Sequence, residues 1–323
     1  MAQSADTATT LVASLISLME SGTSPWRRAW DGPLTGHHVN LRSGRPYRGS
    51  NPVLLTLGMH LRASRLPYWC GWGEARALGL APRRGSKAVH VLRPLLHGRS
   101  DDDPPGSGWV SYRPVAVFNA ADLVGEALPA LLEARRASDG ALLRPEPERL
   151  AAAEALLQRW PVPMDHGGSQ ACYCPQADCI VLPERRAFHS AAAFYATWAH
   201  EVIHSTGHAT RLNRDLSGGF GSPSYAREEL VAELGSVLLG DRLEIGSDLA
   251  NHAAYLASWV TLLQESPRLL LQVLGDVRRA VDLIVPEVPL TADLRADGAS
   301  DQEAPGQNDS DSLSTREPEQ EGT

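Results

Sequence analysis

The stretch HEVIH at residues 200–204 lies inside an apolar segment, residues 188–207, that is predicted to be a helix. Histidines four positions apart lie on one face of a helix, so His200 and His204 can both reach a single Zn²⁺ ion. Glu201 projects beside them and can take a proton from a zinc-bound water. The alternative is a helix that carries two surface histidines and a glutamate. The helical context and further ligands nearby favour a zinc site with Glu201 as the catalytic base.

Such a site needs a third protein ligand, with the fourth position left for water. His208 follows closely in the chain, and a second candidate comes from the next predicted helix, residues 224–241. In that helix Glu229 and Glu233 are four positions apart and share a face, although many acidic pairs are only a charged helix surface. We predict Glu229 as the ligand, Glu233 behind a ligating histidine, and Glu228 as a solvated neighbour. His208 is predicted to lie near the helix end, where it could donate a hydrogen bond behind a ligand or to the transition state. Whether it, Glu229 or Glu233 completes the site stays open here.

The chain has 323 residues, which is long enough for two domains, and 43% of them are hydrophobic. Its net charge of -8 is unevenly distributed. The segment of residues 1–120 is basic, whereas residues 121–290 and 291–323 are both acidic. No apolar run approaches the ~20 residues of a membrane span, and no secretory signal is visible at the N-terminus. Four cysteines do not form a disulfide framework in a chain of this size. We therefore expect a cytoplasmic protein that does not enter a membrane.

Periodicity and turn residues predict a small mixed α/β domain followed by a mainly helical one, an α+β fold class overall. The expected helices are at residues 6–22, 49–61, 73–80, 188–207, 224–241, 249–265 and 267–285, with two more in 120–160 broken near 139–140 and 145. The expected strands are at residues 39–41, 88–92 and 110–118, with a strand pair in 171–182 and a solvated loop at 98–108. The predicted domains are 1–122, a helical linker region 123–165, 166–288, and a disordered acidic tail 289–323.

Basic and aromatic side chains alternate through residues 1–120, as in proteins that bind single-stranded nucleic acid. The candidate DNA-binding residues are Arg27, Arg45, Tyr47, Arg48, Trp72, Arg83, Arg84 and Lys87. The alternative is that the arginines form a solvated face and the tryptophans belong to the core. Trp26, Trp69 and Trp72 fit both descriptions equally well.

Three of the four cysteines, Cys172, Cys174 and Cys179, fall in the predicted strand pair. They lack the paired Cys-x-x-Cys spacing of a structural zinc site, so we expect buried free thiols. The strand itself could form an edge to which an extended peptide adds.

Residues of both predicted domains also resemble a known family, the ArdC-type antirestriction proteins. The part similar to the zincin-like metallopeptidase domain of that family comprises Gly167-Gly168, Ala171, Tyr173, Pro175, Asp178, Ile180, Pro183, Phe188, His200-Glu201, His204, Thr206-Gly207-His208, Arg211-Leu212, Arg214, Tyr225-Ala226, Glu228-Glu229-Leu230 and Ala232-Glu233. The part similar to its N-terminal single-stranded-DNA-binding domain comprises Pro25-Trp26-Arg27, Asn40, Gly44, Tyr47-Arg48-Gly49, Asn51, Trp72, Gly79, Gly85, Lys87 and Phe118-Asn119. The resemblance spans roughly residues 10–285.

The resemblance implies a plasmid- or phage-borne protein that binds single-stranded DNA and protects incoming DNA from restriction. It also implies a zinc metallopeptidase domain, in which Glu201 activates a zinc-bound water against a peptide bond of a protein or peptide substrate. The alternative is a DNA-binding protective protein whose zinc site is structural or vestigial and which cuts nothing. A zinc nuclease is less favoured, because such sites gather more ligands around two metals.

Overall fold

The computed structural model describes residues 9, 12, 13, 16, 37–62, 64–97, 109–142, 144–245 and 253–286. Outside these residues lie most of the predicted helix at 6–22, Trp26 and Arg27, the predicted loop at 98–108 and the predicted tail at 289–323. None of the helices in the described part of the chain has the length and apolar character needed to cross a bilayer.

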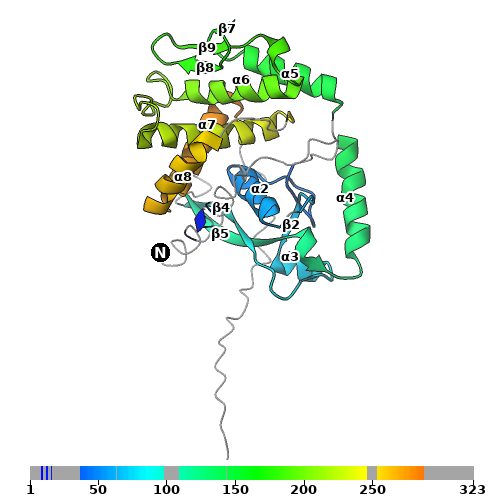
Figure 1. Cartoon of the computed structure of the whole chain (residues 1–323). Coiled ribbons are helices and arrows are strands. Elements are labelled where there is room, and N and C mark those ends of the chain that lie inside the picture. The colour runs from blue at the N-terminus through cyan, green and yellow to red at the C-terminus, as the bar shows by residue number, and fades with distance from the viewer. Residues whose placement is uncertain are drawn as a thin grey trace, which may run out of the picture. The chain divides into compact units, whose positions relative to one another are not determined.

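The first half of the described chain contains a four-stranded sheet in the order β1-β2-β5-β4. Figure 1 labels its strands β2, β4 and β5. Strand β5 (Trp109–Asn119) pairs antiparallel with β4 (Val89–His97) on one side and with β2 (Tyr68–Gly71) on the other. The short β1 (Val39–Asn40) lies parallel to β2. In β4 the buried residues Val89 and Val91 alternate with more exposed ones, which is the period of a strand with one face in the core. The strands β4 and β5 were predicted too short, since their pairing continues to His97 and Trp109.

Helix α2 (Asn51–Leu61) connects this sheet to the helices of the second half. Its Leu55 packs in a core with residues of the sheet, whereas its Val53 and Leu54 belong to the core of the C-terminal helices. The side chain of Asn51 is bonded to both backbone groups of Leu92 in β4, accepting from its N–H at 2.7 Å and donating to its C=O at 3.0 Å. The two halves therefore share apolar core through α2.

Smaller elements complete the first half. They are α3 (Trp72–Ala77), a two-stranded sheet of β3 (Ala81–Pro82) and β6 (Leu123–Val124), and the 3-10 turn η1 (Ala120–Asp122). The helix α4 (Leu128–Leu142) follows and runs through residues 139–140, where a break was predicted. A glycine inside a helix costs only about 1 kcal/mol, which is too little to end one.

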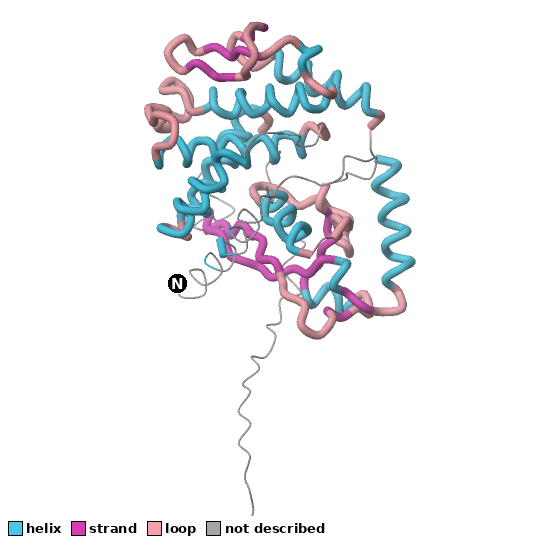
Figure 2. Tube along the Cα trace, viewed as in Figure 1, coloured by secondary structure: helices cyan, strands magenta, loops and turns pink. Residues whose placement is uncertain are grey.

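The second half is mainly helical, with one small sheet (Figure 2). Its helices are α5 (Glu146–Gln158), α6 (Ala191–Thr206), α7 (Pro223–Arg242), α8 (Ala253–Glu265) and α9 (Leu269–Ile284), with a 3-10 turn η2 (Arg185–Ala187). Its strands are β7 (Met164–His166), β8 (Cys172–Cys174) and β9 (Cys179–Leu182), in the order β7-β9-β8, so β8 is an edge strand. The predicted fold class, a small α/β part followed by a mainly helical part, is confirmed.

Helix α6 lies between the small sheet and α7 (Figure 1). It begins where Ser190 accepts a hydrogen bond from the N–H of Ala193, and α7 begins in the same way at Ser222. Both helices are buried along most of their length, and the buried residues of α7 include the three glutamates Glu228, Glu229 and Glu233. The two helices approach closely at Gly235, where a Cβ atom would lie 2.7 Å from Cγ2 of the fully buried Ile203.

We expect Gly235→Ala to lower the free energy of unfolding by about 1–2 kcal/mol, because the added methyl group overpacks the interface between α6 and α7. Overpacking costs about 1–3 kcal/mol, and the better helix propensity of alanine offsets about 1 kcal/mol of that cost. Denaturant unfolding followed by circular dichroism measures it. Gly219→Ala is the control, since no described atom lies within 4 Å of its new methyl group. A more stable Gly235→Ala protein would contradict the close packing.

Candidate metal centre

Three potential metal ligands from two helices converge in the second half. The Nε2 atoms of His200 and His204 on α6 are 3.1 Å apart. The carboxylate of Glu229 on α7 lies 3.8 Å from Nε2 of His200 and 3.7 Å from Nε2 of His204. Among the described residues, these three form the cluster whose ligand atoms all lie within 4.8 Å of one another.

The other ring nitrogen of each histidine faces a second carboxylate of α7. Glu233 is fully buried, and its Oε2 lies 3.8 Å from Nδ1 of His200. Glu228 lies 3.1 Å from Nδ1 of His204. A carboxylate behind a histidine fixes the orientation and tautomer of the ring so that the opposite nitrogen can bind a metal. The prediction that Glu228 is solvated was wrong, because successive helical residues point about 100° apart and both Glu228 and Glu229 can face the broad surface of α6.

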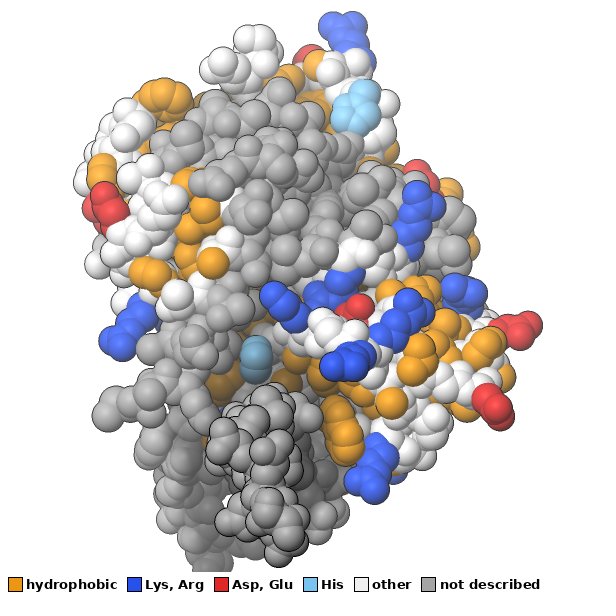
Figure 3. Space-filling view, turned by 60° about the horizontal axis from the view of Figure 1, so that its bottom comes forward, with side chains coloured by type: hydrophobic (Ala, Val, Ile, Leu, Met, Phe, Trp, Pro, Cys, Tyr) orange, Lys and Arg blue, Asp and Glu red, His pale blue; other side chains and the backbone are white. Residues whose placement is uncertain are grey.

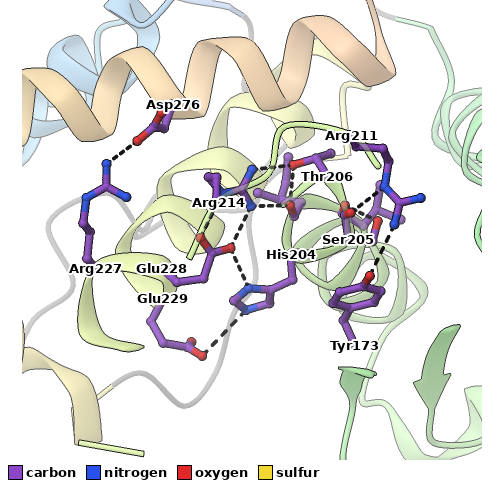
Figure 4. A network of polar contacts seen from close by, with 12 residues as sticks. Tyr173, His204, Ser205, Thr206, Arg211, Arg214, Arg227, Glu228, Glu229 and Asp276 are labelled. Carbon is purple, nitrogen blue, oxygen red and sulfur yellow. Dashed lines mark hydrogen bonds and ion pairs between the residues drawn. The ribbon is translucent and has the colours of Figure 1, made fainter. Parts of the chain in front are cut away.

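Arg214, in the loop between α6 and α7, holds Glu228 in place (Figure 4). Its guanidinium donates to both carboxylate oxygens of Glu228, at 2.8 and 2.7 Å, and to the carbonyl of Ile203 at the end of α6. Burial raises the pKa of Glu228, but Arg214 and His204 outweigh it, so the pKa is held below the usual range. Glu228 therefore remains an anion beside His204. Burial alone would lower the pKa of His204, yet Glu228 and the other carboxylates raise it to about 9.

Glu201 is 6% exposed and lies next to His200 in the chain. Its pKa is raised to about 7, and burial is the largest cause. Glu229 also raises this pKa, whereas His204 and the backbone N–H of Tyr173 in β8 lower it. A carboxyl with a pKa near neutrality can both accept and release a proton under ordinary conditions. Glu201 thus has the properties of a general base at the edge of the three-residue cluster.

The spacing of the three ligands fits a small divalent ion. Zinc bound at about 2.0–2.1 Å in a tetrahedron places neighbouring nitrogen ligands about 3.3 Å apart, close to the 3.1 Å between the two Nε2 atoms. The donor set of two imidazoles and one carboxylate leaves a fourth position open, as in hydrolytic zinc sites.

His208 lies away from this cluster. Its Nδ1 bonds to the Thr210 hydroxyl at 2.8 Å, and in the described part of the chain no hydrogen bond or ion pair joins it to the three ligands. Neighbouring Arg211 instead connects the end of α6 to the β8–β9 hairpin (Figure 4). It donates to the carbonyl of Ser205, to the Tyr173 hydroxyl and to the carboxylate of Asp178. Arg211 and Arg214 could be singled out in the sequence only through the family resemblance, because a lone arginine in a loop does not by itself indicate a structural role.

The predicted free cysteines are exposed or half-buried rather than buried. In β8, Tyr173 points into the core, so its neighbours Cys172 and Cys174 point to the opposite face of the strand. Cys179 in β9 faces Cys174 across the hairpin. The expectation of burial was wrong because only one face of this edge hairpin covers α6.

The candidate DNA-binding residues lie in the first half of the chain, with Arg27 outside the described part. Exposed side chains belong to Arg45, Arg48, Trp72, Arg83, Arg84 and Lys87, whereas Tyr47 is half-buried. Trp72 is 49% exposed, and the Arg76 guanidinium lies 5.7 Å from its ring centroid. Trp69, by contrast, is core, and its indole N–H donates to His38 at 3.1 Å. Figure 3 shows a face on which Lys and Arg side chains lie among exposed hydrophobic ones.

A local network orders the turn that precedes Arg45. Asn40 accepts hydrogen bonds from the N–H groups of Arg42 and Ser43, and its amide donates to both carboxylate oxygens of Glu74 at 2.9 Å. Glu74 also accepts from the backbone N–H of Gly71, which ties the turn to the start of α3. The exposed arginines of this turn thus rest on a fixed backbone.

Comparisons with known proteins match both halves of the chain. Residues 5–110 match the N-terminal domain of the anti-restriction factor ArdC, and residues 151–273 match a zincin-like metallopeptidase domain. Two DNA primases named TraC from Escherichia coli are 35% and 33% identical over 84% of this chain. The chain spans only 26% and 19% of the length of those primases. The uncharacterized protein y4eC of Sinorhizobium fredii (strain NBRC 101917 / NGR234) is 31% identical over 84% of this chain and 89% of its own length.

Two crystal structures of the antirestriction protein ArdC from plasmid R388 have similar folds. The metal-free structure is 30% identical, with a TM-score of 0.63, over 86% of this chain and 96% of the other. The Mn(II)-bound structure is 29% identical, with a TM-score of 0.62 and the same coverage. Together with the zincin-like domain and the ligand cluster, the Mn(II)-bound relative points to a divalent metal ion. The chain belongs to the family of ArdC antirestriction proteins.

Proposed function

We propose that this protein binds single-stranded DNA through its first half and acts as a zinc metallopeptidase through its second half. The observation that carries the peptidase proposal is the convergence of His200, His204 and Glu229 beside the buried carboxyl of Glu201. Zinc bound there would supply Lewis-acid activation of a water molecule and of the scissile carbonyl.

The chain's own residues would perform three tasks. His200, His204 and Glu229 would hold the ion, while Glu233 and Glu228 would orient the two imidazoles from behind. Glu201 would accept the proton of the attacking water and pass it to the leaving amine. Strand β8, at the edge of the small sheet, would pair with an extended peptide substrate.

The DNA proposal rests on the exposed basic side chains together with the exposed ring of Trp72. Basic groups would follow the phosphate backbone, and a base would stack on the indole. The same physics tolerates different sequences, because every base has a flat face. A protein of this kind could coat entering single-stranded DNA and so protect it.

Substituting the ligands one at a time tests the metal centre. We expect this centre to hold one zinc ion, and His200→Ala or Glu229→Gln to abolish binding of that ion. Glu228→Gln, which alters only the residue behind His204, should weaken binding by roughly 10–100-fold. Metal content and competition with a chromophoric chelator measure both effects. His208→Ala and the exposed Glu146→Gln are the controls. If His208→Ala abolishes binding and Glu229→Gln does not, the assignment of the third ligand is wrong.

Anisotropy of labelled oligonucleotides, titrated with the full chain, tests the DNA proposal. We expect tighter binding to single strands than to duplex, and weaker binding at higher salt. Arg45→Ala with Arg48→Ala should reduce the slope of log affinity against log salt by about 1.4, since each single-strand phosphate contact contributes about 0.7.

Trp72→Ala belongs to the same titration and should cost about 1–3 kcal/mol of binding free energy while leaving the salt slope unchanged. Arg186→Ala with Arg268→Ala, two exposed arginines of the second half, is the matched control. Equal affinity of the wild type for duplex and single strand, or no binding at low salt, would contradict the proposal.

Protection of incoming unmodified DNA in a restricting host separates a peptidase from a DNA-binding protein with a structural or vestigial metal. We expect Glu201→Gln to abolish protection while it keeps the bound metal and the affinity for single-stranded DNA, because only proton transfer is removed. Glu146→Gln serves as the control for expression. Full protection by Glu201→Gln would show that proteolysis is not needed and would favour the binding-only function.

A further inference from the structure

Three cysteines gather on one side of the β8–β9 hairpin, apart from the candidate metal centre. The Sγ atoms of Cys172 and Cys174 are 3.8 Å apart. Cys174 and Cys179 are direct partners in the antiparallel pairing of the two strands. The side chains of paired residues project to the same face of a sheet, so all three sulfur atoms share that face.

The separation of the first two sulfur atoms matches that of thiolates bound to one metal ion. A Zn–S bond of about 2.3 Å places neighbouring sulfur ligands of a tetrahedron roughly 3.8 Å apart. At least one pair of the three sulfur atoms is more than 4.8 Å apart. Among the described residues, the group of three potential ligands that all lie within this distance is His200, His204 and Glu229. Cys172 or Cys179 must therefore turn toward the other, and neither of these side chains is buried.

Acidic side chains lie near two of the three thiols, Cys172 and Cys179. Burial, followed by Cys174, Glu201 and Cys179, raises the pKa of Cys172 to about 11. The pKa of Cys179 is also raised, most by burial, less by Cys174, and least by the charges of Asp165 and Asp178. A negative environment disfavours free thiolates but favours a bound cation that compensates their charge.

We propose that Cys172, Cys174 and Cys179 form a thiolate site for a soft, thiophilic metal ion such as Zn²⁺ or Cd²⁺, separate from the His200–His204–Glu229 cluster. Binding releases the thiol protons to solvent as the sulfur–metal bonds form, with no change in the oxidation state of sulfur or metal. Affinity therefore rises with pH. The site would lie on the strand whose backbone faces Glu201.

Titration of the reduced, metal-stripped full chain with Cd²⁺ tests the proposal. Sulfur-to-cadmium charge-transfer absorption in the ultraviolet reports binding to thiolates only. We expect the band to saturate with one equivalent bound at the thiols and to disappear in Cys172→Ser with Cys174→Ser. Cys179→Ser should retain the band but bind Cd²⁺ at least tenfold more weakly, because one of three sulfur ligands is lost.

Two variants separate this site from the rest of the chain. His200→Ala with Glu229→Gln should keep the charge-transfer band, since those ligands contain no sulfur. Cys70→Ala, which removes the buried thiol of the first half, should keep it as well. Circular dichroism of each variant reports folding. As a readout that needs no variant, Cd²⁺ should protect Cys172 and Cys174 of the wild type from alkylation, as measured by mass spectrometry.

A wild-type protein without the band, or a band that survives loss of Cys172 and Cys174, would overturn the proposal. So would the finding that the unreduced protein has lost two titratable thiols to a disulfide and that the reduced protein binds no Cd²⁺. Loss of the band in His200→Ala with Glu229→Gln would also overturn it, because the sulfur site would then not be separate.

Discussion

Four carboxyl groups are buried around two histidines in the second half, and their charge is the constraint on which this part of the fold depends. Glu201, Glu228, Glu229 and Glu233 are each less than a tenth exposed. Burying a carboxylate without a counter-charge is costly, and among the described residues Arg214 is the guanidinium that contacts this group. The pKa of His204 is raised to about 9, so its ring adds a second positive charge, and the pKa of Glu201 is raised to about 7, so that group is only partly ionised. Arg214 and His204 together still fall short of balancing the four carboxyl groups. A divalent cation held by His200, His204 and Glu229 would supply the missing positive charge, so the electrostatics and the geometry favour the same occupant.

The packing of α6 on α7 keeps these groups in register. The histidines repeat every four residues along α6, and Glu229 and Glu233 repeat every four along α7, so facing turns meet in pairs. Gly235 lets the helices approach closely, two residues beyond Glu233. Arg214 and Arg211 then tie the loop after α6 to α7 and to the β8–β9 hairpin. The site is thus set by two buried helices and two arginine clamps.

How much could be predicted from the sequence follows from the range of the interactions. The spacing of residues 200–204 is a local signal, and it predicted the helix and two potential ligands together. The prediction of Glu229 as the third ligand used a second local signal, the four-residue spacing of Glu229 and Glu233 in the next predicted helix. The burial of Glu228 could not be predicted, because it depends on how α7 is rotated against α6, and a pair of adjacent glutamates is compatible with either face. The exposure of the three cysteines depends on which face of a two-stranded edge is covered, and an irregular apolar stretch does not specify this.

Helix α2 links the two halves of the chain, because its side chains contribute to the hydrophobic cores of both. Its Leu55 packs against the sheet, and its Val53 and Leu54 pack with the C-terminal helices. Ser50, just before α2, donates a hydrogen bond to the carbonyl of Leu274 in α9. Removing either half would expose one apolar face of this helix, at about 25 cal/mol for each Å² uncovered. The relatives match both halves together, over 84% of this chain, even where the matched region is a small part of a much longer primase. A shared core gives a physical reason for that joint occurrence, because the DNA-binding candidate and the metal centre are stabilised by the same helix.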